Sequence, residues 1–160
     1  ADIKSTGLKE LQGLVWAIGY GEGKLNSHVF ADVPTAFKRW KDAGIDLRIY
    51  SSGSIGAQQV FFANTEYGAL STYLLGHYDT TTGPKREADS YIKIAADIGT
   101  PPGNILFLSD ITAELDAAAS AGMQVALVTR PGNAAGEPCS YSTIESFDQL
   151  NLIALSSSEN

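Results

Sequence analysis

Apolar residues along this chain alternate between a helical spacing and short continuous runs. Residues 5–19 repeat apolar side chains every three or four positions, which predicts an amphipathic helix. The β-branched and aromatic runs IDLRIY at 45–50 and ILFLS at 105–109 predict strands. Asp32 is expected to cap a second helix, with Pro34 in its first turn. In full, the pattern predicts helices at 5–19, from Asp32 to Gly44, and at 55–63, 68–75, 85–98 and 112–121, strands at 45–50, 77–80, 105–109 and 124–129, and a small edge strand and helix within 142–150.

This order of elements indicates the fold class. Strands that alternate with helices of about ten residues predict right-handed crossovers and a parallel sheet. The continuous apolar run ILFLS is typical of a strand buried on both faces. We therefore expect a three-layer, Rossmann-like α/β fold. Ligands of such sheets bind beyond the carboxyl ends of the strands, which is where Ser51, Ser52 and Asp110 fall.

Composition narrows the class of partner. The 160 residues include 18 acidic and 11 basic side chains, which give a net charge of −7. This balance argues against a nucleic-acid surface or an anionic membrane surface, because both need clustered Lys and Arg. The single cysteine, Cys139, excludes an intramolecular disulfide and fits a reducing compartment. We expect a cytoplasmic monomer that binds a small molecule.

Ser51 and Ser52 follow the predicted strand at 45–50 and precede Gly53. Hydroxyls and the backbone N–H groups of a glycine-containing turn can hold a phosphate group by neutral donors. Serine and glycine are also ordinary turn formers, and both interpretations remain open for this pair.

Lys85 and Arg86 are predicted to open the helix at 85–98. Exposed cations at a helix N-terminus oppose the helix dipole at a cost of about 0.3–1 kcal/mol each. A bound phosphate would turn this conflict into attraction. The alternative is a solvated pair of cations whose charge Glu87 softens.

Asp110 ends the predicted strand at 105–109. A carboxylate in this place is either the cap of the following helix or a ligand for a hard cation. Mg²⁺ needs only one or two protein carboxylates, and Glu114, one helical turn further on, could lie behind such a ligand.

Several other kinds of site are excluded by the sequence. His28 and His77 are far apart and form no ligand set, and we expect His77 to be a packed core residue. The chain has no GxGxxG motif after a strand, no GxxxxGK[ST] motif and no GxSxG motif.

The serine, lysine and aspartate, in this order, resemble the site of the haloacid dehalogenase-like phosphatases. Several longer stretches of the sequence further resemble the enolase-phosphatases, or acireductone synthases, of methionine salvage. This similarity runs from about residue 2 to about residue 133. The stretches that carry it are LKELQGLVW (8–16), IYSSGSIGAQ (49–58), YDTTTGPKREADSY (78–91), ILFLSDITAELDAAASAGM (105–123) and VTRPGN (128–133).

The resemblance implies a role for each matching residue. Ser51 would hold the phosphoryl group, and Ser52 would contact the substrate beside it. Lys85 would neutralise the phosphate and tie the substrate to the nucleophile, and Asp110 would bind Mg²⁺. Members of this family enolise 2,3-diketo-5-methylthiopentyl-1-phosphate and remove its phosphate to give the acireductone.

One departure from the family is large. Its nucleophile is the first aspartate of an Asp-x-Glu-Gly-Thr stretch that ends the first, central strand, and these 160 residues contain no such stretch. We therefore expect residues 1–25 to be the C-terminal part of a helical cap and residues 26–160 to be the core domain without its first strand. We also expect these residues alone to lack phosphatase activity. The alternative is a catalytically inactive, truncated phosphatase-fold domain with a phosphate-binding or scaffold role.

Overall fold

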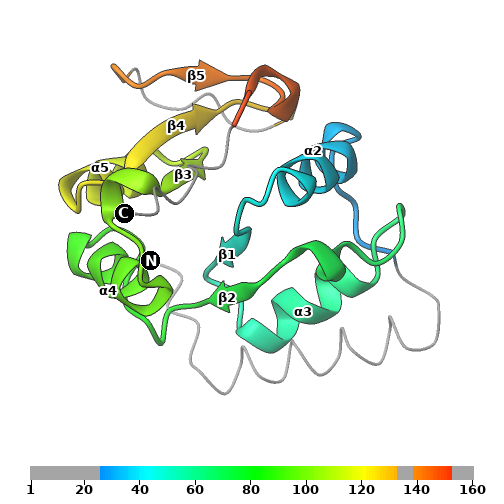
Figure 1. Ribbon diagram of the computed structural model, residues 1–160, viewed down its shortest axis with the longest axis horizontal. Coiled ribbons are helices and arrows are strands. Elements are labelled where there is room, and N and C mark those ends of the chain that lie inside the picture. Colours follow the sequence, from blue (N-terminus) through cyan, green and yellow to red (C-terminus); the bar gives the residue numbers. More distant parts are fainter. Residues whose placement is uncertain (1–25, 133–138, 153–160) are drawn as a thin grey trace, which may run out of the picture. The chain divides into compact units, whose positions relative to one another are not determined.

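A computed structural model describes residues 26–132 and 139–152 of the chain (Figure 1). The chain divides into two compact units, residues 1–80 and 81–160. The helix predicted at 5–19 lies outside the described residues, and the proposed cap boundary after residue 25 stays a prediction.

The described elements follow the predicted order. The α-helices are α2 (Asp32–Asp42), α3 (Ile55–Ala63), α4 (Ala88–Ile98) and α5 (Thr112–Ser120). The strands are β1 (Arg48–Tyr50), β2 (Gly76–Tyr78), β3 (Leu106–Ser109), β4 (Gln124–Val128) and β5 (Thr143–Ile144), and short 3₁₀ turns are η1 (Leu70–Tyr73), η2 (Pro102–Asn104) and η3 (Phe147–Gln149). The strands are shorter than predicted, and the segment at 68–75 forms a 3₁₀ turn.

In the first unit, β1 and β2 pair in parallel and lie side by side in Figure 1, with Ile49 opposite His77. Helix α3 packs against β2 and η1, and α2 packs against η1. The buried face of α2 carries Phe37 and Trp40, whose ring centroids are 6.3 Å apart. The spacing of these two rings therefore predicted the buried face correctly.

The start of α2 differs from the prediction. The N-cap is Ala31, which makes no side-chain cap hydrogen bond, and Asp32 is the first helical residue. The carboxylate of Asp32 still lies in the first turn, where a negative charge interacts favourably with the helix dipole.

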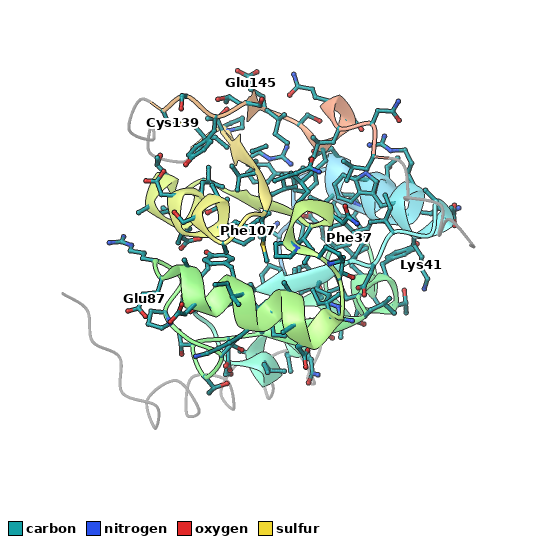
Figure 2. The ribbon with its side chains drawn as sticks, turned by 60° about the vertical axis from the view of Figure 1, so that its left-hand side comes forward. Phe37, Lys41, Glu87, Phe107, Cys139 and Glu145 are labelled. Atoms are coloured by element: carbon teal, nitrogen blue, oxygen red, sulfur yellow. The ribbon has the colours of Figure 1, made fainter. Side chains whose placement is uncertain are left out.

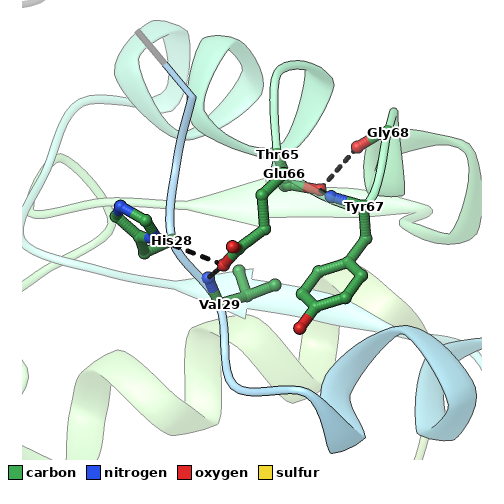
Figure 3. Close-up of polar contacts among 6 residues, drawn as sticks. All are labelled: His28, Val29, Thr65, Glu66, Tyr67 and Gly68. Carbon is green, nitrogen blue, oxygen red and sulfur yellow. Dashed lines mark hydrogen bonds and ion pairs between the residues drawn. The ribbon is translucent and has the colours of Figure 1, made fainter.

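The described part of the chain begins with a segment anchored to the end of α3 (Figure 3). Ser27 forms a parallel bridge with Thr65, and the Glu66 backbone N–H donates to the Ser27 carbonyl at 3.1 Å. The Glu66 carboxylate lies 3.2 Å from His28 Nδ1 and also accepts a hydrogen bond from the Val29 backbone N–H (Figure 3). These contacts hold residues 27–29 against the turn that follows α3.

In the second unit, the three strands β3, β4 and β5 form a parallel sheet in that order. Helix α5 packs on β3 and β4, and α4 packs on α5. Tyr91 of α4 meets Phe107 of β3 edge to face, with ring centroids 4.9 Å apart; Figure 2 labels Phe107. Parallel strands joined by helices confirm the α/β class predicted from the sequence.

The predicted single sheet is present as two parallel sheets, β1–β2 and β3–β4–β5. The expectation that ILFLS is buried throughout was wrong, because β3 is only partly buried along its length. Among the residues that the structure describes, β3 is an edge strand and pairs only with β4. No helix among the described residues is long and apolar enough to cross a membrane.

The close packing of α5 gives a stability prediction. Ala118 is fully buried in the packed face of α5, whereas Ala113 of the same helix is exposed. We expect Ala118→Leu to lower the free energy of unfolding in urea by about 1–3 kcal/mol, because extra methylenes in a packed core force strain. Ala113→Leu is the matched control and should change it by less than about 0.5 kcal/mol. Equal effects of the two changes would contradict this packing.

Candidate active site

The loop that follows β1 carries the two predicted serines. The Ser51 backbone N–H donates to the Tyr78 carbonyl at 3.1 Å, and the Gly53 N–H donates to Ser51 Oγ at 3.2 Å. Ser51 is therefore a turn former, as the alternative interpretation had it. Its hydroxyl acts as the acceptor in this contact, so the hydroxyl proton remains available for donation to another group.

Ser52 and Ser54 differ in their surroundings. Ser54 is the N-cap of α3, and its Oγ accepts a hydrogen bond from the Ala57 N–H at 3.2 Å. Ser52 is exposed and has no hydrogen bond to any residue within 26–132 or 139–152. Within the described residues, Ser52 is therefore the serine of this loop that takes no part in holding its backbone.

The predicted start of the helix at residue 85 was wrong. Helix α4 begins at Ala88 with Glu87 as its N-cap, and Figure 2 labels Glu87 at the beginning of this helix. Lys85 and Arg86 lie in the turn before the helix. They are therefore not in its first turn, and the predicted conflict with the helix dipole does not arise there.

The turn at Lys85 is held by buried hydroxyls of α4. Ser90 Oγ donates to the Pro84 carbonyl at 2.7 Å, and the Glu87 N–H donates to the same carbonyl at 3.2 Å. Tyr91, which is fully buried, donates its hydroxyl to the Lys85 carbonyl at 2.6 Å. Because these carbonyls are bound by side chains, the backbone turns at Lys85 instead of continuing the helix upstream.

The side chain of Lys85 forms an ion pair with Glu114 at 2.6 Å. The pair is largely buried, with side chains 21% and 11% exposed. Ser109 Oγ donates to the same Glu114 oxygen at 2.9 Å and accepts from the Ile111 N–H at 3.0 Å. Sequence reasoning had placed Glu114 behind a metal ligand and missed its pairing with Lys85.

Asp110 lies between Ser109 and Ile111, at the carboxyl end of β3. The N-cap of α5 is Ile111, whose side chain makes no cap hydrogen bond, so Asp110 is not the N-cap residue of this helix. The Asp110 side chain is exposed. Its backbone is held because the Ser109 hydroxyl accepts a hydrogen bond from the Ile111 N–H and so closes the turn that contains Asp110.

The side chains near Asp110 determine whether this carboxylate could hold a cation. No group of three or more His, Cys, Asp or Glu side chains that could hold a metal is present among the described residues. Mg²⁺, however, commonly takes one or two protein carboxylates and completes its shell with water and substrate phosphate. An exposed carboxylate at a strand end fits that requirement.

The structure thus brings together Lys85, Glu114 and Ser109 beside Asp110. Ser51 and Ser52 belong to the other compact unit. That all four predicted residues converge on one pocket stays a prediction.

Sequence reasoning missed two buried polar residues of the first unit, Gln58 and Asp79. His77, expected in the core, is partly buried in β2; burial lowers its pKa from the usual 6.5, and its Nδ1 lies 3.0 Å from Gln58 Oε1. Asp79 is buried and accepts a hydrogen bond from the Ile55 N–H at 3.2 Å. The available signal for Gln58 was the pair of glutamines, Gln58 and Gln59, on the otherwise apolar α3.

Residues 4–122 match the haloacid dehalogenase-like hydrolase family. The chain belongs to this family. The fold and family resemblance expected from the motifs are therefore confirmed.

Curated relatives in this family are enolase-phosphatases. The chain is 55% identical over 150 residues to Enolase-phosphatase E1 of Synechococcus elongatus. The matched region covers 94% of this chain and 63% of the relative. It is 46% identical over 157 residues to Enolase-phosphatase E1 of Drosophila erecta. This match covers 96% of this chain and 61% of the relative. The chain thus spans somewhat less than two thirds of the length of these relatives.

Two solved structures resemble this chain in fold. The UTR4 protein of Saccharomyces cerevisiae superimposes with a TM-score of 0.82 at 40% identity, over 93% of this chain and 69% of that one. CbbY of Rhodobacter sphaeroides, solved in complex with phosphate, matches with a TM-score of 0.70 at 16% identity, over 94% of this chain and 68% of that one. At this identity the match supports the fold alone.

The turn that carries Lys85 gives a second prediction. Gly83 has φ +153°, and a Cβ atom added there would collide with Ser90 Oγ, the donor to Pro84. We expect Gly83→Ala to lower the free energy of unfolding by about 1–3 kcal/mol in urea denaturation, from backbone strain and the broken hydrogen bond. Gly103→Ala is the control, because no atom lies nearer than 4.0 Å to the added Cβ. A neutral Gly83→Ala would show that the turn is not held as described.

Proposed function

We propose that this chain is part of a Mg²⁺-dependent enolase-phosphatase. Its substrate would be 2,3-diketo-5-methylthiopentyl-1-phosphate, and its product the acireductone of L-methionine salvage. The observation that carries the proposal is the buried Lys85–Glu114 pair beside Asp110, at the carboxyl end of a parallel strand. Identities of 46–55% to enolase-phosphatases across nearly the whole chain support the substrate class.

The roles we assign follow from charge and hydrogen bonding. The Lys85 ammonium would neutralise the phosphoryl group and stabilise the negative charge that develops on the enolised carbonyl oxygen. The Ser51 hydroxyl, which has a proton left to donate, and the exposed Ser52 would hold phosphoryl oxygens by neutral hydrogen bonds. These are the positioning and neutralising functions that phosphoryl transfer needs.

Asp110 would hold the metal ion. When bound, Mg²⁺ supplies positive charge that screens the phosphoryl oxygens. Glu114 would act on Lys85: its carboxylate fixes the ammonium, and Ser109 fixes the carboxylate.

The nucleophile would come from outside these 160 residues. They contain no Asp-x-Glu-Gly-Thr stretch, and the relatives are longer than this chain. The same missing stretch favours the second candidate function, a catalytically inactive domain that binds phosphate or serves as a scaffold.

The role of Lys85 is tested in the full-length protein with Lys85→Gln. Glutamine keeps a donor for the buried Glu114 carboxylate but removes the positive charge; Lys85→Ala would leave that carboxylate unpaired and would also destabilise the fold. A charged contact of about 1.5–3 kcal/mol predicts a fall in kcat/KM of at least about tenfold, up to about a hundredfold.

Two further variants serve as controls for this change. Arg86 is exposed one position on, and Arg86→Ala should change kcat/KM less than about twofold. Lys85→Arg should restore activity only in part, because a planar guanidinium does not reproduce a compact ammonium. Equal losses from Lys85→Gln and Arg86→Ala would refute the assignment.

The origin of the nucleophile is tested by comparing two purified proteins. We expect residues 1–160 with Mg²⁺ to release no phosphate above the protein-free background from the diketo phosphate ester, because covalent catalysis lacks its carboxylate. The full-length protein should turn over. Turnover by residues 1–160 alone would contradict the proposal, and inactivity of both would favour the non-enzymatic alternative.

A further inference from the structure

A buried glutamine of α3 is aimed at the serine loop. Gln58 is only 5% exposed, although it lies on a helix whose other buried or half-buried residues are mostly apolar. Its Nε2 donates to the Gly53 carbonyl at 2.9 Å and to the Tyr78 carbonyl at 2.8 Å. One side chain therefore ties the loop after β1 to the end of β2.

The third polar contact of Gln58 defines its orientation. Both Nε2 donors point at carbonyl oxygens, so the amide oxygen Oε1 must be the acceptor toward His77 Nδ1 at 3.0 Å. His77 Nδ1 consequently carries the proton in this contact. The imidazole of β2 thus holds the amide in the orientation that the loop requires.

The loop is held at its other end as well. The Tyr78 carbonyl accepts from the Ser51 N–H at 3.1 Å in addition to Gln58, and the buried Asp79 carboxylate accepts from the Ile55 N–H at 3.2 Å. The chain from Ser51 to Ile55 is thus fastened to β2 and to α3, while Ser52 between these points stays exposed.

We propose that Gln58 is a positioning residue for the phosphoryl group and that His77 orients Gln58 for this task. This inference rests on the proposed function of Ser51 and Ser52. A glycine-containing loop has many accessible conformations, and neutral donors bind an anion well only when they are already aligned. A buried amide costs free energy unless it is hydrogen-bonded, so a helix that needed only packing here would be better served by an apolar side chain.

The inference is tested on full-length protein with Gln58→Met, which keeps an unbranched side chain and removes all three hydrogen bonds. The probe is inorganic phosphate, titrated calorimetrically in the presence of Mg²⁺. We expect its dissociation constant to rise about tenfold, the loss of roughly one net hydrogen bond from an aligned loop. Gln59→Met, an exposed neighbour on the same helix, is the matched control and should leave binding within about twofold.

Two variants of His77 test the orienting step. His77→Leu removes the donor to Gln58 Oε1 and should weaken phosphate binding in the same direction as Gln58→Met. His77→Asn places an amide donor near the position of Nδ1 and should restore binding toward that of the unaltered protein. A purely structural role would predict that both changes follow the thermal stability of the variants and not the presence of the donor. This pair also decides the matter if Gln58→Met does not fold.

Amide hydrogen exchange without ligand separates this inference from the proposed function. Faster exchange of Gly53 and Ile55 in Gln58→Met than in Gln59→Met is expected if the loop is clamped. Absence of phosphate binding by the unaltered protein would refute the proposed function. Unchanged exchange and unchanged phosphate binding in Gln58→Met, with the unaltered protein binding normally, would refute the positioning role alone.

Discussion

The ion pair between Lys85 and Glu114 determines how the second unit presents its polar residues. It joins the turn before α4 to the first turn of α5, two segments that are far apart in sequence. Ser109 at the end of β3 adds a hydrogen bond to the same carboxylate oxygen. Sheet, turn and helix therefore meet at one buried carboxylate. Removing one partner would leave a buried charge unpaired, which is far more costly than losing an exposed ion pair.

The first unit holds its serine loop by hydrogen bonds with buried side chains. There, Gln58 satisfies two backbone carbonyls with neutral donors, and His77 orients it. Burial lowers the pKa of His77, which favours the neutral ring at physiological pH. Gln58 and His77 hold the loop with neutral groups, and the buried Asp79 carboxylate accepts a hydrogen bond from the Ile55 N–H at the far end of the loop. The two units thus fix their exposed polar residues by buried partners of different chemistry.

The sequence predicted those features that depend on local periodicity. The buried face with Phe37 and Trp40, the alternation of strands and helices and the parallel pairing all follow from the spacing of apolar residues. The start of α4 did not, because it depends on Ser90 and Tyr91 binding carbonyls six residues upstream. Likewise, the partial burial of β3 depends on its place at the sheet edge, which no local pattern encodes.

Site residues were predictable to a similar degree. Lys85, Asp110 and the serines stand out because of their residue types and their places beside strand ends. Their partners did not stand out, since Glu114 and Gln58 act through contacts across 29 and 19–20 residues or from within a helix. A single sequence gives the residue types available for such contacts but not which pairs form.

Charge at the end of β3 finally constrains what can bind there. The single positive charge of Lys85 is matched by Glu114, and Asp110 adds a negative charge that is exposed. These three side chains together are net negative, and the whole chain is net negative too. A phosphate dianion would be repelled by that net negative charge, whereas a divalent cation on Asp110 would make the net charge positive. The ion pair that orders the second unit therefore also gives a physical reason why Lys85 alone would be a weak phosphate site, and why the proposed phosphatase would need Mg²⁺.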